Sequence, residues 1–198
     1  GAGLHHVSMR VPDAAAAVTS LRADGFAPWG VEGVEGTDDA GAGEPDGTFY
    51  LHPRQGGNGF LYQLEGGEAE MPPVVLDAAD DQDERTLGII GVNHLAHAFP
   101  DAEQLGDWYE RVFGLHTVYR SPGDGREAGF ATRVLESWRF PLRFEVIQPA
   151  TSSSYIRRFL DRRGPGMHHV TFEVGDWERA VHACALYGVP LFGERYGE

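Results

Sequence analysis

The sequence contains no lysine, so its 16 basic residues are all arginine. This absence excludes enzymes that form a Schiff base on a lysine side chain and nucleotide-binding loops that need one. The single cysteine, Cys184, excludes a disulfide within one chain, and its apolar neighbours predict a place on the buried face of a helix. No apolar run approaches the roughly 18 residues that cross a bilayer, and no signal peptide is recognisable, so we expect a cytoplasmic protein.

Positive charge is also scarce. There are 30 acidic residues against 16 basic ones, which gives a formal net charge of −14. Charge of this sign repels a phosphate backbone and an anionic membrane surface, so neither nucleic acid nor a membrane is an expected partner. The hydrophobic fraction of 41% is that of a globular chain able to bury a core. The expected partner is therefore a small-molecule substrate or ligand.

One eleven-residue segment occurs three times along the chain. The copy at residues 3–13, GLHHVSMRVPD, shares six of its 11 positions with the copy at residues 166–176, GMHHVTFEVGD. A weaker copy, GVNHLAHAFPD, occupies residues 91–101. His6, His94 and His169 stand at the same position of the three copies, which predicts one structural module repeated three times.

The residues after each copy are also similar. An aspartate that can cap a helix N-terminus ends each segment, and a helix-ending glycine comes 19 or 20 residues after each histidine. The aspartates are Asp13, Asp101 and Asp176, and the glycines are Gly25, Gly114 and Gly188. Alternating apolar residues then predict strands at 48–52 and 59–65 in the first copy, and at 115–120, 128–136 and 142–148 in the second.

These patterns predict an α+β fold of repeated βαβββ modules that pair into a curved half-barrel sheet. We expect a first module at 1–66, a linker at 67–88, a second module at 89–150, a linking helix at 151–165 and a partial third module at 166–198. The partial module has no closing strands of its own. A neighbouring chain, as in a homodimer, or residues outside this sequence would complete its sheet.

Each module offers polar side chains that can meet on the concave side of its sheet, since alternate residues of a strand face the same way. The first module offers His6 and Gln63, the second His94 and Glu145, and the third His169 alone. Glu145 lies among apolar residues, where a carboxylate costs several kcal/mol unless it is paired or bound to a metal. A solvent-facing Glu145 is an equally good interpretation of that strand alone, but the polar Gln63 at the equivalent position favours a ligand.

Two imidazoles with carboxyl or carboxamide oxygens suit a divalent Fe, Mn, Co, Ni or Zn ion. Two sites are compatible with the sequence: the first and second modules together, with His6, Gln63, His94 and Glu145, or the second and third, with His169 in place of the first pair. No catalytic base is identifiable. The remaining histidines are interpreted as structural, either because the repeat does not support them or because they face the other side of their strand: His5, His52, His97, His116, His168 and His182.

The His-His-Val-x-x-x-Val-x-Asp pattern, Glu145-Val-Ile-Gln-Pro149 and Gly164-Pro-Gly-Met-His-His169 resemble the vicinal oxygen chelate superfamily of glyoxalases, bleomycin resistance proteins and dioxygenases. Within it, the methylmalonyl-CoA epimerases are the most similar. The resemblance implies a glyoxalase-like fold in which a first-strand His and a last-strand Gln or Glu from each of two modules hold the ion. Those positions match His94 with Glu145, and His6 with Gln63, with His169 as the alternative second histidine.

The resemblance implies a metal-dependent epimerase, isomerase or lyase that acts through an enolate of a small 2-oxo acid or acyl thioester. Two other functions stay open. The stretch from Asn93 to His169 is also similar to 4-hydroxyphenylpyruvate dioxygenase, an Fe(II) enzyme that needs two His and one Glu. The third is a metal-free protein that binds a drug or another small molecule on the same fold.

Overall fold

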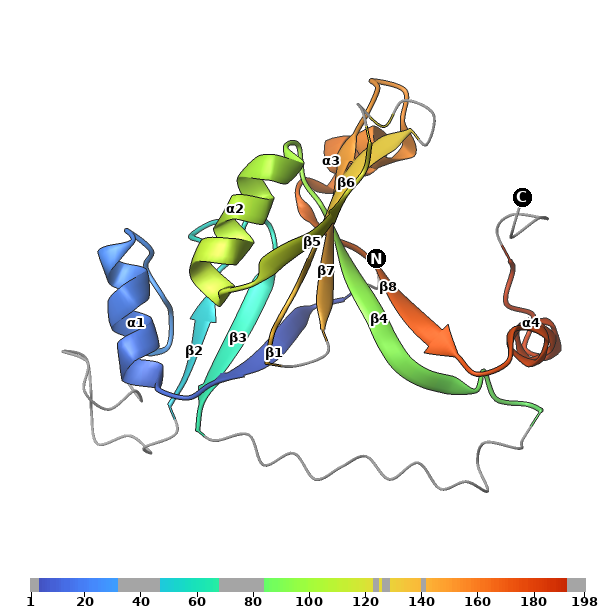
Figure 1. Cartoon of the computed structure of the whole chain (residues 1–198), viewed down its shortest axis with the longest axis horizontal. Coiled ribbons are helices and arrows are strands. Elements are labelled where there is room, and N and C mark those ends of the chain that lie inside the picture. Colours follow the sequence, from blue (N-terminus) through green and yellow to red (C-terminus); the bar gives the residue numbers. More distant parts are fainter. Residues whose placement is uncertain are drawn as a thin grey trace. The chain divides into compact units, whose positions relative to one another are not determined.

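The structure is a computed structural model, which describes residues 4–31, 47–67, 84–122, 125, 129–139 and 142–191. This part of the chain contains both strands and helices (Figure 1). Their order is β1 (His6–Val11), α1 (Ala14–Ala23), β2 (Thr48–Leu51), β3 (Leu61–Gly66), β4 (Ile89–Ala98), α2 (Ala102–Phe113), β5 (His116–Arg120), β6 (Phe130–Glu136), β7 (Arg143–Pro149), α3 (Tyr155–Arg163), β8 (Gly166–Val174) and α4 (Trp177–Leu186).

The chain divides into two compact units, and the division passes through two strands. Unit 1 comprises Gly1–Met71 and Leu95–His169, and unit 2 comprises Pro72–His94 and Val170–Glu198. Strands β4 and β8 therefore each begin in one unit and end in the other. Unit 1 contains the other six strands with α1, α2 and α3, whereas unit 2 contains α4 and the remaining parts of β4 and β8.

The three helices that come after the repeated segment begin as the sequence predicts. The side chains of Asp13, Asp101 and Asp176 each accept hydrogen bonds from free backbone N–H groups in the first turns of α1, α2 and α4. Each aspartate has an extended backbone conformation that joins a strand to its helix. The predicted N-caps are thus confirmed in all three copies.

The helix ends match the prediction to within one residue. Gly114 is the C-cap of α2 and has the left-handed conformation, with φ of 63°. In α1 and α4 the C-caps are Asp24 and Tyr187, and the predicted glycines, Gly25 and Gly188, come next with positive φ. Cys184 on α4 is half-buried rather than fully buried. Within the described residues, no helix is both long and apolar enough to cross a membrane.

The first module forms a three-stranded sheet with the order β1-β3-β2. β1 is parallel to β3, and β2 is antiparallel to it. The fourth strand expected in this module is present, among the described residues, only as an isolated bridge between Trp29 and Tyr50. Gly30 comes directly after that bridge with φ of 73°, a left-handed conformation that turns the chain and ends the extended run.

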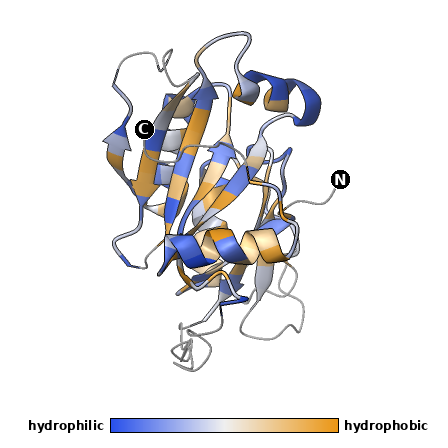
Figure 2. Cartoon of the chain, turned by 90° about the vertical axis from the view of Figure 1, so that its right-hand side faces the viewer, coloured by the Kyte–Doolittle hydropathy of each residue, from blue (hydrophilic) through white to orange (hydrophobic). Residues whose placement is uncertain are grey.

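The second module and the beginning of the third form a five-stranded sheet with the order β5-β6-β7-β4-β8. β6 and β7 are antiparallel, and β4 is parallel to β7. Hydrophilic and hydrophobic residues alternate along the strands (Figure 2), which is the pattern of a sheet with two different faces. The described sheets stay open, and the predicted α+β class is confirmed.

Helix α2 covers one face of the five-stranded sheet and α3 covers part of the other, so we call them the α2 face and the α3 face. On the α2 face, the ring of Phe144 stacks on Tyr109 of α2 at 4.6 Å between centroids. On the α3 face, Ile147 of β7 packs with Ile156 of α3. Since strand residues alternate, Glu145 lies on the same face as Ile147.

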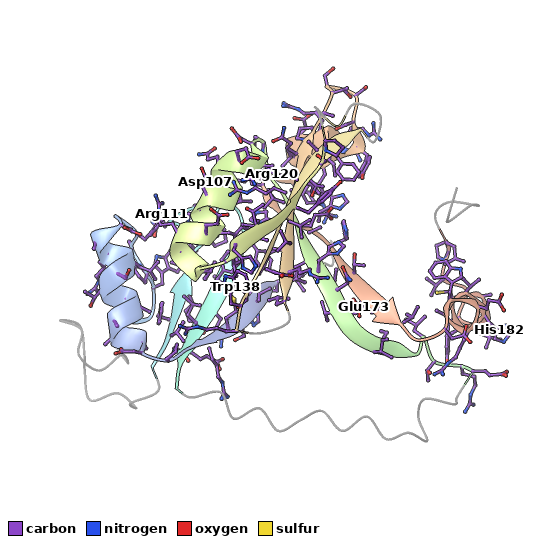
Figure 3. All side chains as sticks on the ribbon, viewed as in Figure 1. Asp107, Arg111, Arg120, Trp138, Glu173 and His182 are labelled. Carbon is purple, nitrogen blue, oxygen red and sulfur yellow. The ribbon has the colours of Figure 1, made fainter. Side chains whose placement is uncertain are left out.

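The α2 face carries a buried arginine. The Arg133 side chain is 1% exposed and donates hydrogen bonds to Glu103 at 2.9 Å and Asp107 at 2.8 Å, both on α2. It also pairs with Glu110 at 2.9 Å. Figure 3 shows Asp107 projecting from α2. Space for the guanidinium comes from Gly106, where an added Cβ would lie 2.5 Å from Arg133 atoms. The charge is thus buried but fully paired.

A buried hydrogen-bonded chain joins the first module to the second. The Tyr62 and Tyr109 hydroxyls are 2.6 Å apart, and the Tyr109 hydroxyl lies 3.0 Å from Nδ1 of His97. Nε2 of His97 lies 3.0 Å from the carbonyl oxygen of Asn58. A carbonyl can only accept, so Nε2 carries the proton and Nδ1 accepts from Tyr109. Burial lowers the pKa of His97 to about 4 and raises that of both tyrosines, which keeps the chain neutral.

Candidate metal centre

Glu145 lies in the middle of β7 on the α3 face. Its side chain is 17% exposed, so the carboxylate is largely shielded by the sheet and yet reaches solvent. Thr132 of the neighbouring strand β6 donates a hydrogen bond from Oγ1 to Glu145 Oε1 at 3.0 Å. This bond fixes one carboxylate oxygen and leaves the other, Oε2, directed toward β8.

His169 of β8 faces this carboxylate. Its Nε2 lies 4.0 Å from Glu145 Oε2, and its side chain is 41% exposed. The preceding residue, His168, contacts α3 instead, with its ring 4.9 Å from that of Phe159 between centroids. This contact is consistent with the packing role predicted for His168.

His94 of β4 immediately precedes Leu95, the residue at which unit 1 resumes. Its Nδ1 lies 2.8 Å from Asn93 Oδ1, and the Asn93 amide nitrogen donates to Glu173 Oε1 at 2.6 Å. Figure 3 labels Glu173 on β8. Because the amide nitrogen is the donor to Glu173, Oδ1 is the acceptor, and His94 donates to it from Nδ1. Nε2 then carries the lone pair, and it lies 3.0 Å from Thr171 Oγ1.

One ligand atom each from His94, Glu145 and His169 lie within 4.8 Å of one another. Ligand atoms that share one ion at about 2.1 Å each lie at most about 4.2 Å apart, so small side-chain rotations would close the group around an ion. The donor set of two imidazoles and one carboxylate is also one that borderline divalent ions accept. Within the part of the chain that the structure describes, this is the single group of three His, Cys, Asp or Glu side chains whose ligand atoms lie this close together.

His6 and Gln63 are not part of this group. His6 is exposed, and its Nδ1 lies 3.0 Å from Nδ1 of His5. The Gln63 amide nitrogen donates to Glu65 Oε1 at 2.7 Å, and Ser8 donates to the same oxygen at 3.0 Å. Register pairs Ser8 with Gln63. The polar face of the first module is thus occupied by hydrogen bonds among its own side chains.

The charge of Glu145 extends over the neighbouring groups. Burial raises the pKa of Tyr155, and the Glu145 carboxylate raises it further. Burial lowers the pKa of His168, as does His169, while Glu145 acts in the opposite direction. These groups surround a site with one fixed negative charge, which is an environment that attracts a cation.

Several groups around the site could not be recognised in the sequence. Thr132 and Thr171 carry no motif, and their role depends on which strands become neighbours. Asn93 takes the place of the first histidine of the repeated pair, which is the one signal that sets this copy apart. Glu173 belongs to a repeated segment, but its position is Arg10 in the first copy and so gave no indication of a role.

Three of the other four histidines, His52, His97 and His116, contact neighbouring side chains. The ring of His52 stacks on Trp29 at 3.8 Å between centroids, and that of His116 stacks on Trp138 at 3.6 Å. His97 is the buried member of the hydrogen-bonded chain. His182 projects from α4 (Figure 3) and is exposed. The interpretation of these four as structural is consistent with their surroundings.

Comparison with known proteins identifies relatives. Residues 93–198, more than half of the chain, match the family model described as the glyoxalase/bleomycin resistance protein/dioxygenase superfamily. A mitochondrial methylmalonyl-CoA epimerase from Dictyostelium discoideum is 31% identical over 108 residues, which cover 53% of this chain and 61% of that protein. An uncharacterized protein from Synechocystis is 25% identical over 146 residues, which cover 72% of this chain and 43% of that protein.

Among solved structures, methylmalonyl-CoA epimerase from Mycobacterium tuberculosis is similar, with a TM-score of 0.50 and 26% identity. The match covers 54% of this chain and 70% of that one. The chain spans between 43% and 61% of the length of the two curated relatives above. The family match, at residues 93–198, and the candidate metal centre both lie in the second and third modules.

Proposed function

Because the chain belongs to the glyoxalase/bleomycin resistance protein/dioxygenase superfamily, we propose that it is a metal-dependent enzyme that moves a proton at a carbon next to a carbonyl group. Its substrate is a small 2-oxo acid or an acyl thioester, and its reaction is an epimerisation, isomerisation or lyase step. The observation that carries the proposal is the convergence of His94, Glu145 and His169.

The three side chains would hold one divalent Fe, Mn, Co, Ni or Zn ion, with positions left for substrate oxygens. This choice pairs the second module with the third, and leaves His6 and Gln63 outside the site. The grouping of ligand atoms supports that choice, because it includes His169 and not His6.

When bound, a divalent ion supplies Lewis acidity, which lowers the pKa of the C–H bond beside a coordinated carbonyl. The chain's own groups orient the site. Thr132 holds one oxygen of Glu145, and Asn93 holds the proton of His94 on Nδ1 so that Nε2 presents its lone pair. On the α3 face, the buried side chains of Ile147, Ala96 and Ala98 lie on the same strands as Glu145 and His94. They would limit the access of water to the metal centre from that side.

The acyl thioester in this proposal is supported by the relatives. The Dictyostelium and Mycobacterium proteins are methylmalonyl-CoA epimerases, and an epimerase of this kind must remove and return a proton beside a thioester carbonyl. At 31% and 26% identity, the relatives support the type of reaction but do not identify the substrate of this chain.

The test is proton exchange with solvent. The protein is first treated with EDTA, then loaded separately with Mn²⁺, Co²⁺, Zn²⁺, Ni²⁺ or Fe²⁺ and incubated in D₂O with a methylmalonyl-type thioester or a 2-oxo acid. We expect deuterium at the carbon next to the carbonyl, read by NMR or mass spectrometry, with at least one ion. Metal bound in a one-to-one ratio without exchange on either substrate class would contradict the proposal.

Two variants make this test specific. Glu145→Ala should abolish both metal binding and exchange, because it removes the carboxylate ligand. Gln63→Ala changes the equivalent position of the first module and should leave both unchanged. Equal losses in the two variants would mean that the first module also belongs to the site, contrary to the proposal.

A second candidate function is favoured by the same donor set, since two histidines and one carboxylate are also the ligands of Fe(II) oxygenases. Under this alternative, the Fe²⁺-loaded protein would consume oxygen with an aromatic 2-oxo acid. An oxygen electrode separates the two functions, because proton exchange needs no oxygen. Exchange under nitrogen favours the first, and oxygen uptake without exchange favours the second.

A further inference from the structure

A surface cavity of about 390 Å³ lies along α3, within unit 1. Its size falls in the range of about 300–1,000 Å³ that small-molecule sites occupy. Five of its six lining residues come from α3 at the spacing of one helical face, and the sixth comes from the start of β8. The lining residues are Tyr155, Arg158, Phe159, Arg162, Arg163 and His168.

The three arginines of this cavity differ from several other arginines in the described part of the chain. Within the described residues, Arg133, Arg143 and Arg157 each pair with a carboxylate of a neighbouring residue. Among the same described residues, no carboxylate lies within ion-pair distance of Arg158, Arg162 or Arg163. Arg158 donates to the backbone carbonyl of Ser153 at 2.6 Å, and the guanidinium of Arg163 lies 5.9 Å from the Phe159 ring centre. In a chain of net charge −14, unpaired cations gathered on one surface are unexpected.

Helix stability does not account for this arrangement. The helix dipole favours Arg162 and Arg163 in the last turn of α3, but it opposes a cation at Arg158 near the N-terminal end. Arg158 and Arg162 are also four residues apart, where like charges repel. The ion-pair partner of Asp161 on this helix is Arg157, at 2.9 Å, rather than Arg158 or Arg162. An anion in the cavity would offset these costs.

We propose that this cavity binds the phosphoryl groups of a small nucleotide-type ligand. Guanidinium groups present a planar set of donors that matches phosphate oxygens, and three of them can share a diphosphate. The rings of Tyr155, Phe159 and His168 line the same cavity and offer surfaces on which a base can stack. The overall negative charge disfavours a long nucleic acid but not a ligand with two or three charges.

This inference does not rest on the proposed metal-dependent activity. It uses none of the candidate metal ligands, and binding can be measured without turnover. The site is nonetheless close to them in the chain, since His168 lines the cavity and the next residue is His169. Failure of the metal proposal would therefore leave the nucleotide proposal standing, and the reverse also holds.

The experiment is calorimetric titration of the full chain with ADP, pyrophosphate and adenosine, in EDTA so that no cation links phosphate to protein. We expect ADP to bind most tightly, pyrophosphate more weakly and adenosine not at all up to about 1 mM, a free energy of about −4 kcal/mol. Affinity for ADP should fall as NaCl is raised from about 50 mM to about 500 mM, because the contacts are partly exposed ion pairs.

Variants assign the binding to the cavity. Arg158→Gln and Arg162→Gln should each weaken ADP binding about tenfold, the effect of one lost charged hydrogen bond. Arg157→Gln is the matched control, because it removes the same charge from the same helix outside the cavity, and it should change affinity less than about twofold. Circular dichroism and thermal unfolding verify that each variant is folded.

Four results would overturn the proposal. These are no binding of ADP or pyrophosphate, adenosine binding as tightly as ADP, an equal loss in Arg157→Gln, and no loss in either cavity variant. Pyrophosphate binding as tightly as ADP would overturn the assignment to a nucleotide, since the aromatic residues would then contribute nothing.

Discussion

The two faces of the five-stranded sheet both carry polar residues, but they satisfy them differently. On the α2 face, Arg133 and His97 are 1% and 0% exposed, and each has its hydrogen-bonding groups paired within the protein. On the α3 face, Glu145 and His169 are 4.0 Å apart and reach solvent. The first arrangement holds elements together, while the second brings metal-ligand atoms close to one another near the surface.

A polar residue in an apolar strand does not by itself indicate a ligand-binding site. Arg133 and Glu145 occupy neighbouring strands with similar alternating patterns. The two residues differ in what lies over them. Helix α2 supplies three carboxylates to Arg133, whereas the side chain that faces Glu145 is His169 of β8. Changes on the α2 face should therefore alter stability, and changes on the α3 face should alter binding.

The largest expected effect is on the α3 face. His169→Ala should weaken binding of Co²⁺ or Zn²⁺ by more than about 100-fold, which exceeds the usual cost of losing an outer-shell partner. The free energy of unfolding without metal should change by less than about 1 kcal/mol, because His169 is 41% exposed. Titration calorimetry and urea unfolding give the two values. His6→Ala, at the equivalent position of the first module, should change neither.

The next effect is a pH dependence that arises on the α2 face. Burial lowers the pKa of His97 from its ordinary value of 6.5 to about 4, so the unfolded chain takes up a proton at a higher pH than the folded protein does. The stability contributed by neutral His97 is complete above about pH 6.5 and is lost as pH falls toward 4, by about 2 kcal/mol between pH 7 and pH 5. Urea unfolding across this range measures it.

The matched variant for that prediction is His97→Gln, which removes the titrating group. The variant should be less stable at neutral pH because the hydrogen bonds to Tyr109 and Asn58 are altered. Its stability should fall less steeply between pH 7 and pH 5 than that of the unmodified protein. Parallel slopes would mean that other groups produce the acid sensitivity.

A smaller effect concerns the space beneath Arg133. Gly106→Ala adds a methyl group 2.5 Å from the guanidinium, and we expect a loss of about 1.5 kcal/mol in stability even though alanine is the better helix former. In an Arg133→Ala background the same change should become stabilising, since the steric conflict is gone. Chemical denaturation of the four proteins completes the cycle. Metal affinity should be unaffected by Gly106→Ala alone.

The smallest predicted effect compares two threonines. Thr132→Val removes the hydrogen bond to Glu145 and should weaken metal binding about tenfold with little change in stability. Thr117→Val on the α2 side removes contacts to Glu110 and Arg133, and should lower stability without changing metal affinity. If both variants altered metal affinity equally, the division of labour between the two faces would be disproved.

The repeated segment made most of the fold predictable. Because a capping aspartate and a helix-ending glycine act within a few residues, their effects can be inferred locally, and α1, α2 and α4 begin where Asp13, Asp101 and Asp176 indicate. The alternation in β6 and β7 is equally local. Within the described residues, the reduction of the first module's fourth strand to a single bridge at Trp29 was not predictable, because it depends on the turn at Gly30 and on the partner of Trp29, Tyr50.

The site was only partly predictable for the same reason. His94, Glu145 and His169 were recognisable by position in the repeat, but the sequence left two pairings of modules open. The structure brings these three together and gives Gln63 a different partner, Glu65. Whether they bind metal stays a prediction. The supporting groups, such as Thr132, become recognisable only when the strand order is known, since thirteen residues separate it from Glu145.

The hydrogen-bonded chain of Tyr62, Tyr109 and His97 has a practical consequence for protein engineering. The family match begins at residue 93, which invites expression of a shorter fragment from that point. Such a fragment would lack Tyr62 and Asn58, so it would lose the hydrogen-bond partners of Tyr109 and His97 and expose to water the aromatic rings that Tyr62 packs against. A minimal stable version must therefore retain the β2–β3 hairpin, even though the match to the family model begins only at residue 93.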